Sequence, residues 1–226
     1  MKSTTRRATI SIEVVLFTPH GKGLAALLRR NPDARSRERW SLPWDAPRAD
    51  ESLGEAALRI ARAPLGVDPS WLEQSGAFGQ ERRHPGDANV SIAFVGLIPA
   101  GAPAVVGGDD AWFQLTELPT LAPRHKAIVE GALEAVQARM DHAPIAFRLL
   151  PATFTLSDLQ QVYELLLGRR LHKASFRRAL QAAWLVEPTD EWRSEGRGRP
   201  AQLFRYAPRK RRASRRGVRF ELLAGG

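Results

Sequence analysis

Cysteine is missing from the 226-residue sequence, and long hydrophobic runs are scarce. Without cysteine the chain forms no disulfide bond and no thiolate metal site, so nothing in it points to an oxidising compartment. The longest uncharged run, 90–108, is interrupted by Pro99, Pro103 and several glycines, which excludes a membrane span. Near the amino terminus, Glu13 interrupts an apolar run and no small-residue cleavage site follows. We therefore expect a cytoplasmic protein with no membrane association.

Positive charge is concentrated in the last third of the sequence, and the whole chain carries a formal net charge of +10. Residues 1–150 contain 18 Lys and Arg against 17 Asp and Glu, whereas residues 151–226 contain 16 against 7. The run Arg209–Arg216 supplies six of these basic residues and is typical of a basic tail, which we place at 209–226. The remaining excess favours a C-terminal region that faces nucleic acid.

The order of apolar segments predicts an α+β fold. Strand-like stretches occur at Thr9–Phe17, Leu24–Arg30, Val90–Ile98 and Ala111–Leu115. A helical pattern, Ser52–Ala63, lies among them, and a further helix is expected from about 124 to 140. This mixture indicates an α/β/α sandwich, after which the pattern becomes helical and ends in a short β-like segment.

The segment 42–67 resembles the signature of the Nudix hydrolase superfamily. In that signature a glycine and a glutamate lead into a helix that carries an Arg-Glu pair and a Glu-Glu pair and ends before a glycine. Here Glu51, Arg59, Gly66 and Val67 occupy matching positions. Glutamates three and four residues apart share one helix face, where they hold Mg²⁺ ions that polarise a pyrophosphate and activate water.

Most glutamates that this chemistry requires are absent. Ile60 replaces the glutamate of the Arg-Glu pair, and Ala63 and Pro64 replace the Glu-Glu pair. Because proline cannot continue a helix without losing a hydrogen bond, we expect the helix to end at Pro64. Glu51 and Glu55 remain four residues apart, and Glu55 stands four residues before an arginine. We interpret them as a solvated Glu–Arg ladder on the helix surface.

These departures predict a protein with no catalytic and no metal-binding residues. Trp44 and Asp45 also replace the glycine pair that usually follows the Leu-Pro of this loop. The alternative is a Nudix-type nucleotide-diphosphate hydrolase with atypical metal ligands. Mg²⁺-dependent release of AMP from ADP-ribose would distinguish this hydrolase from a protein without catalytic residues.

Two helices joined by a turn are predicted in the C-terminal third. The stretch 155–158 is typical of a capping box, and apolar residues then recur at three- and four-residue spacing until Gly168. A second helix, about 173–183, buries Phe176 and Leu180. The residues of this helix expected to reach base edges or phosphates are Lys173, Ser175, Arg177, Arg178 and Gln181.

A hairpin with an arginine- and glycine-rich tip follows these helices. Trp184–Glu187 and Gln202–Tyr206 read as its strands, with Trp192–Pro200 between them. A helix–turn–helix followed by such a hairpin is a winged helix. Arg197 and Arg199 suit a narrow minor groove, because the neighbouring glycines permit close backbone approach. RNA binding is a further alternative, but the aromatic platform that single-strand recognition prefers is not evident, so we favour double-stranded DNA.

The order of these motifs resembles the Nudix-related transcriptional regulator family (NrtR). The stretches that carry the resemblance are Ala143–Phe147, Leu150-Pro151, Phe154–Leu156, Arg197–Pro200, Gly76–Gly79, Trp112-Phe113, Leu118-Pro119 and His125. The resemblance implies a degenerate Nudix-like domain, expected at 1–142 with a linker helix at about 124–140. It implies a winged-helix DNA-binding domain at 143–208.

The same resemblance implies a function. Members of this family are homodimeric repressors of NAD-metabolism genes, and their operator binding responds to an NAD-derived metabolite such as ADP-ribose. For this chain we expect a palindromic operator and no cofactor. The candidate effector-binding residues are Arg29, Arg30, Phe78, Arg82 and Arg83, since guanidinium groups make paired contacts with phosphates.

Overall fold

The chain folds into two compact units. The computed structural model describes residues 9–31, 37–79, 84–101, 108–140, 143–194 and 199–207. Unit 1 comprises residues 1–98 and 103–134, and unit 2 comprises residues 99–102 and 135–226. Within the described ranges, no helix combines the length and apolarity needed to cross a membrane.

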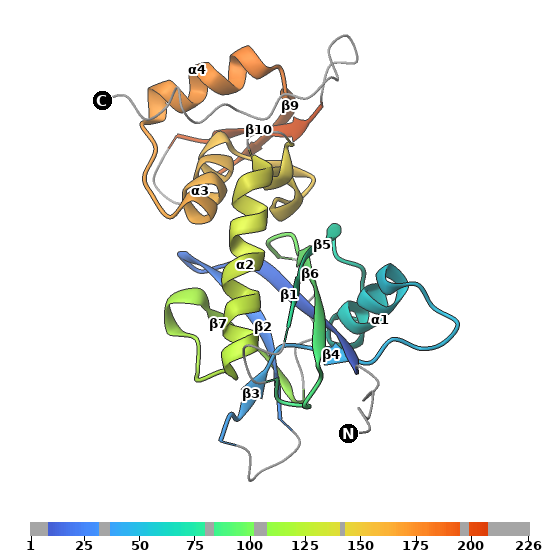
Figure 1. Ribbon diagram of the computed structural model, residues 1–226. Coiled ribbons are helices and arrows are strands. Elements are labelled where there is room, and N and C mark those ends of the chain that lie inside the picture. Colours follow the sequence, from blue (N-terminus) through green and yellow to red (C-terminus); the bar gives the residue numbers. More distant parts are fainter. Residues whose placement is uncertain are drawn as a thin grey trace, which may run out of the picture. The chain divides into compact units, whose positions relative to one another are not determined.

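A seven-stranded mixed sheet forms the centre of unit 1 (Figure 1). Its strands are β1 (Ile10–His20), β2 (Gly23–Arg30), β3 (Trp40–Ser41), β4 (Trp44–Asp45), β5 (Trp71–Phe78), β6 (Val90–Leu97) and β7 (Asp110–Gln114). Strand β1 lies parallel to β6 and antiparallel to β2. It is buried from Ser11 to Phe17, as its nearly continuous apolar sequence predicts for a strand covered on both faces.

Strands β1 and β2 separate away from their connecting turn, and β3 and β4 lie in this fork between them. β1 pairs with β2 only beside their connecting turn, from Phe17 to His20. Beyond that point β3 pairs with β2 at Arg29 and Arg30, and β4 pairs with β1 at Ile12 and Glu13. The segment 40–45 therefore enters the centre of the sheet. Its pairing partners lie on β1 and β2, outside the segment itself, which is why no local pattern predicted these short strands.

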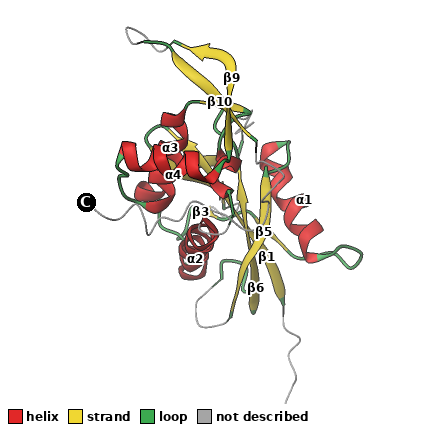
Figure 2. Ribbon diagram, turned by 90° about the horizontal axis from the view of Figure 1, so that it is seen from above, coloured by secondary structure: helices red, strands yellow, loops and turns green. Residues whose placement is uncertain are grey.

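Helix α1 (Leu53–Leu65) and the part of α2 (Pro123–Met140) that belongs to unit 1 cover opposite faces of the sheet (Figure 2). A capping box between Ser52 and Glu55 starts α1, and Gly66 ends it in a left-handed conformation with φ of 68°. The expectation that α1 ends at Pro64 is wrong, because Gly66 supplies the termination signal and the helix includes Leu65.

Unit 2 is a small helical domain with a three-stranded sheet in the order β8-β10-β9. Its elements are η2 (Ile145–Leu149), β8 (Thr153–Phe154), α3 (Leu156–Leu167), α4 (Lys173–Ala183), β9 (Val186–Arg193) and β10 (Ala201–Tyr206). Aromatic residues form its core: Tyr163 of α3 and Phe176 of α4 meet edge to face at 5.4 Å between ring centroids. This packing fixes the two helices against each other.

The strands of unit 2 differ from the sequence expectation at β8, which was not predicted, and at both ends of β9. The hairpin strand β9 begins at Val186 and continues to Arg193, so Trp192 and Arg193 belong to the strand and not to the loop. In unit 1, β5 includes Gly76 to Phe78, which the sequence analysis did not assign to a strand. A short 3-10 turn, η1 (Leu115–Glu117), follows β7.

Candidate effector and DNA-binding sites

Arg59 is paired with Glu51, the glutamate of the Nudix signature that this chain retains. Its Nε and Nη2 donate to the two oxygens of Glu51 at 3.0 Å and 2.6 Å, and its Nη1 donates to Asp45 at 2.6 Å. The hydrogen bond from Arg59, together with one from the backbone N–H of Arg48, lowers the pKa of Glu51 to about 2. Asp45, which replaces a signature glycine, therefore helps to hold this arginine.

Glu55 serves as a helix cap. Its Oε2 accepts from the backbone N–H of Ser52 at 2.8 Å, and this bond lowers the pKa of the carboxyl group. The Glu–Arg ladder predicted Glu55 as the partner of Arg59. This is wrong, because Arg59 bonds Glu51 and not Glu55. Ile60 and Pro64 are buried in the core. Both oxygens of Glu51 and one oxygen of Glu55 are therefore engaged in hydrogen bonds.

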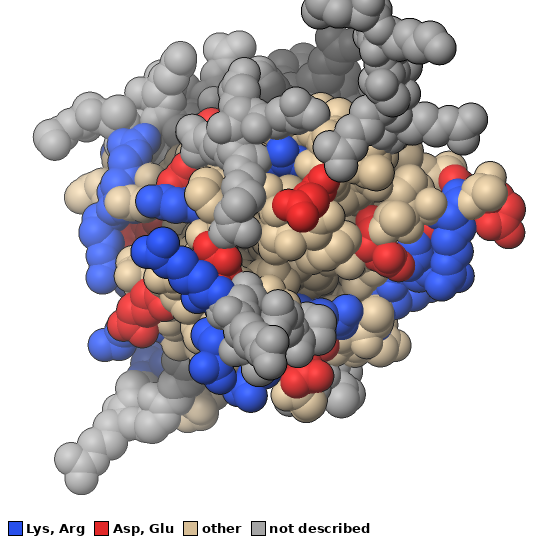
Figure 3. Space-filling model, turned by 60° about the horizontal axis from the view of Figure 1, so that its bottom comes forward, with Lys and Arg blue, Asp and Glu red and all other residues tan. Residues whose placement is uncertain are grey.

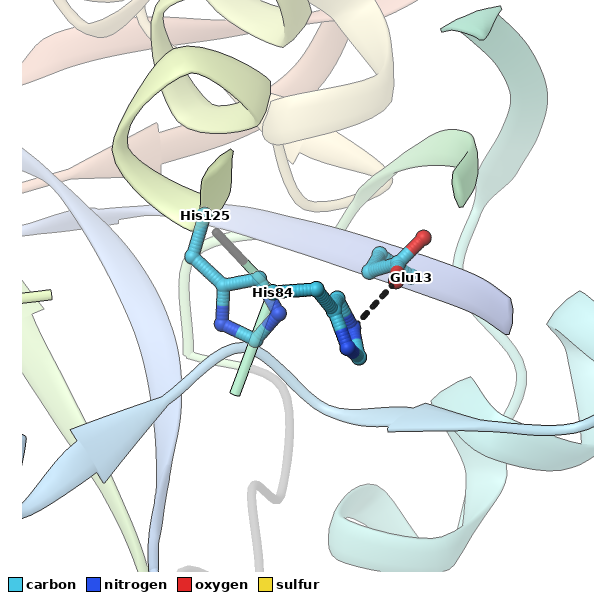
Figure 4. Close-up of side chains that lie close together, drawn as sticks. All are labelled: Glu13, His84 and His125. Atoms are coloured by element: carbon cyan, nitrogen blue, oxygen red, sulfur yellow. Dashed lines mark ion pairs between the residues drawn. The ribbon is translucent and has the colours of Figure 1, made fainter. Parts of the chain in front are cut away.

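A cluster of three buried side chains, Glu13, His84 and His125, lies elsewhere in unit 1 (Figure 4). They come from β1, from the loop before β6 and from the first turn of α2. The Nε2 of His84 lies 2.8 Å from Oε1 of Glu13, although its N–H does not point squarely at that oxygen. The two imidazole rings meet edge to face at 5.1 Å.

Backbone hydrogen bonds determine which nitrogen of each histidine carries hydrogen. Nδ1 of His84 accepts from the N–H of Gly86 at 2.9 Å, and Nδ1 of His125 accepts from the N–H of Leu42 at 3.1 Å. In a neutral imidazole the hydrogen must then be on Nε2. The Nε2–H of His84 therefore lies beside the Glu13 carboxylate. The cluster has the residue types of a metal site, but each Nδ1 already accepts a backbone N–H and each Nε2 carries hydrogen, so we assign no metal there.

Burial controls the electrostatics of this cluster. It lowers the pKa of His125 to about 3, with further contributions from His84 and from the neighbouring Arg124. Burial also lowers the pKa of Arg124, an effect that the Glu13 carboxylate opposes. Arg124 Nη1 donates to the carbonyl of Ala88 at 2.6 Å. The first turn of α2 thus holds the same loop that carries His84.

Among the candidate effector residues that the structure describes, each makes a separate contact within unit 1. Arg29 is bound through Nε and Nη2 to Asp110, at 2.9 Å and 3.2 Å, which occupies one edge of its guanidinium group. Arg30 lies over the ring of Trp40, 5.5 Å from its centroid. Phe78 packs against Gly131 of α2. Arg82 and Arg83 lie outside the described residues.

Acidic and basic side chains are interspersed on the face shown in Figure 3. This agrees with the near balance of charges in residues 1–150, where the two signs differ by one. A ligand phosphate on such a surface requires specific arginine contacts, because the described residues on that face form no broad field of one sign.

Helix α4 presents the basic face that the sequence predicted. Lys173, Arg177, Arg178 and Gln181 are exposed, whereas Phe176 and Leu180 are buried. Ser175 is half-buried, and its Oγ lies 3.3 Å from Nδ1 of His172. Of the two wing arginines, Arg199 is exposed and Arg197 falls outside the described residues.

Two ion pairs that the sequence analysis missed hold this helical unit together. Arg193 of β9 bonds both oxygens of Asp158 on α3 at 2.8 Å and 2.7 Å. Glu164 accepts from the backbone N–H of Leu171 at 2.9 Å and from Arg170 at 3.0 Å, and it thereby closes the turn between α3 and α4. The pairing of the hairpin with α3 is a tertiary contact that has no sequence signal.

Known proteins match both units. Residues 7–132 match the NUDIX domain family, and residues 146–206 match the NrtR DNA-binding winged helix domain. The crystal structure of Shewanella oneidensis NrtR complexed with a 27mer DNA is 30% identical, covers 88% of this chain and 94% of its own, and superposes with a TM-score of 0.77. The chain belongs to the NrtR family.

Another relative of this NrtR-family chain is the ADPR-responsive transcriptional repressor NtrR of Acinetobacter baylyi. It is 28% identical over 213 residues, which is 91% of this chain and 85% of the relative. A MutT/nudix family protein from Enterococcus faecalis shares the fold, with 21% identity, a TM-score of 0.72 and coverage of 90% and 89% of the two chains. The α+β Nudix unit and winged-helix unit expected from the sequence are confirmed.

Proposed function

We propose that this protein is a transcriptional repressor that binds operator DNA through unit 2 and ADP-ribose, or a related NAD-derived metabolite, through unit 1. A repressor among its relatives is named as ADPR-responsive, and NrtR from Shewanella oneidensis has been crystallised with DNA. The regulated genes that we propose are those of NAD metabolism.

The exposed face of α4 carries the DNA-binding half of this proposal. Arg177 and Arg178 project from a helix whose other side is fixed by Phe176 and Leu180 in the core. A rigid helix with long basic donors on one face fits the major groove, where arginine reads guanine edges and phosphates. We propose that Lys173, Ser175, Gln181 and Arg197 assist them, and that Arg199 enters the adjacent minor groove.

A second proposal concerns the state of the ligand. We propose that unit 1 binds its effector without hydrolysing it, because the signature helix has Ile60, Ala63 and Pro64 in place of glutamates. The one glutamate that matches the signature, Glu51, is neutralised by Arg59. A sensor benefits from this chemistry, since an effector that is consumed while being read gives a decaying signal.

The test combines a DNA-binding and a hydrolysis measurement on the full chain. DNA recovered with the protein from its host supplies the operator for a gel-shift titration with ADP-ribose. We expect a specific complex whose affinity changes about 5- to 150-fold on adding ligand, the usual range of allosteric coupling. Incubation of the same ADP-ribose with protein and Mg²⁺ should release no AMP. Release of AMP at catalytic rates would support the hydrolase alternative instead.

We further propose that the protein binds a palindromic operator as a homodimer, because one winged helix offers too few base contacts for a specific site. Light scattering on the protein–DNA complex gives its mass directly. Two chains per DNA duplex are expected. A stable, sequence-specific complex with one chain per duplex would contradict the dimer.

A further inference from the structure

We propose that His84 is a positioning residue that couples effector binding in unit 1 to helix α2. The inference rests on the proposed function, since it concerns how that function is regulated. His84 is 1% exposed, yet it makes polar or ring contacts with three separate parts of unit 1. Each of these contacts connects the loop that carries His84 to a different element.

The Nδ1 atom of His84 folds its own loop. It accepts from the backbone N–H groups of Gly86 at 2.9 Å and of Ala88 at 3.4 Å. Ala88 is buried, and a buried backbone N–H without a partner is costly, so the acceptor helps to define the turn that leads into β6. This half of the imidazole has a local, structural role.

The Nε2 side of His84 faces away from the loop. It lies 2.8 Å from Oε1 of Glu13, in the middle of β1, and Oε1 also accepts from Ser11 Oγ at 2.5 Å. The ring packs edge to face against His125 and, at 4.7 Å, against Trp44. The imidazole therefore joins the loop to β1, β4 and α2 at one point.

Helix α2 holds this loop through two consecutive residues. His125 packs against His84, while Arg124 donates to Ala88 at its carbonyl, 2.6 Å away, and to Ser91 at 3.4 Å. The backbone of Ala88 is thus bound on its N–H side by His84 and on its carbonyl side by Arg124. Any rearrangement of residues 84–91 changes contacts of the first turn of α2.

The far end of α2 contributes to unit 2. The helix runs without interruption from Pro123 to Met140, and its residues from 135 onward belong to unit 2. There Gln137 Nε2 donates to the carbonyl of Leu166, in the last turn of α3, at 2.8 Å. A continuous helix with one end in the His84 contacts and the other bonded to α3 is a suitable element for coupling the two ligands.

The experiment separates the two sides of the imidazole with a matched pair of variants. His84→Asn places an amide oxygen near the position of Nδ1, so it retains the acceptor for the loop but cannot reach Glu13. His84→Gln reaches toward Glu13 and gives up the acceptor for the loop. For each variant we would measure operator affinity with and without saturating ADP-ribose, and ADP-ribose affinity without DNA.

We expect His84→Asn to bind each ligand alone within about threefold of the unsubstituted protein and to lose most of the ligand-induced change in operator affinity. His84→Gln should keep more of that change and bind ADP-ribose more weakly. Retention of the full change by His84→Asn would overturn the inference. Lys126→Ala is the control, because Lys126 lies in the same turn of α2 with a side chain that is 71% exposed.

Glu13→Gln provides a second route if His84→Asn does not fold. It keeps the volume of the side chain and removes its charge, and it should also reduce the ligand-induced change. If ADP-ribose does not change the operator affinity of the unsubstituted protein, the proposed function fails, and the role of His84 fails with it. If the purified protein contained one equivalent of transition metal and the His84→Asn variant contained none, the assignment of the His84 Nε2 as a hydrogen-bond donor would be overturned.

Discussion

The indole ring of Trp44 packs so closely against Gly86 that a β-carbon at position 86 would collide with it. Trp44 stands where the Nudix signature has glycine, and its bulk fits because residue 86 has no side chain. The same ring contacts His84 edge to face, with 4.7 Å between ring centroids. Trp44, His84 and Gly86 therefore form one packed group, in which the segment that enters the fork of the sheet meets the loop before β6.

Gly86→Ala should destabilise the protein by about 1–3 kcal/mol, because the added methyl group has to displace the indole. Urea unfolding followed by tryptophan fluorescence gives the change in free energy. Gly79→Ala is the matched control, since a β-carbon there meets no atom within 4 Å. In a Trp44→Ala background the cost of Gly86→Ala should fall close to zero; an unchanged cost would mean that another contact is responsible.

Stability should fall as the pH decreases below about 6.5, and His125 is one cause. Its pKa in the folded protein is lowered from 6.5 to about 3, so below pH 6.5 the unfolded chain binds a proton that the folded protein excludes. The slope is at most about 1.4 kcal/mol per pH unit for one group. Its contribution is complete above pH 6.5 and is lost progressively toward pH 3.

His125→Asn tests this assignment between pH 6.5 and 5, above the range in which carboxylates such as Glu51 titrate. Asparagine retains an acceptor for the N–H of Leu42 and has no proton to gain. The variant should lose less stability than the unsubstituted protein over this interval. Parallel curves for the two proteins would show that the buried imidazole does not titrate on unfolding.

Arg59→Gln should raise the pKa of Glu51 from about 2 toward its ordinary value of 4.5, because the hydrogen bonds from Arg59 are the largest cause of the shift. Carboxyl carbon chemical shifts followed against pH measure it directly. The variant should still release no AMP from ADP-ribose, since one freed carboxylate is too few ligands for Mg²⁺. Arg62→Gln, on the same helix and paired with Asp68, is the control.

Arg178→Ala should reduce discrimination between the operator and a mismatched site, with a loss of about 1–3 kcal/mol if the side chain contacts a guanine edge. Arg199→Ala should weaken binding to all sequences, with the largest loss at A·T-rich flanks. Competition gel shifts with matched and mutated duplexes distinguish the two patterns. A uniform loss from Arg178→Ala would place that arginine on the phosphates.

Elements with strong local signals were predictable from the sequence. The expected helix 173–183 coincides with α4, because its apolar face is regular, and the capping box at Thr155 begins α3 as expected. Strand β5 was missed because its sequence, WLEQSGAF, does not alternate clearly between apolar and polar residues. The two-residue strands β3 and β4 exist only through their partners in the sheet.

The buried cluster was beyond prediction because its members come from distant segments. Its one sequence signal was a charge at Glu13 within an otherwise apolar strand, which calls for a buried partner. Spacing alone also misassigned the partner of Arg59. A four-residue separation favoured Glu55, but Glu55 caps the helix at Ser52, so the arginine reaches back to Glu51.

The division of the chain has a consequence for how such proteins diversify. Unit 2 includes residues 99–102, and the N–H of Ala100 donates to the carbonyl of Leu149 at 2.9 Å. It also includes the last turns of α2, from which Gln137 reaches Leu166. A hybrid protein joined at residue 146 would receive both of these contacts from a foreign sequence. The donor at position 100 is a backbone group that any residue except proline supplies, so exchange of DNA-binding modules between relatives requires a matching side chain only at position 137.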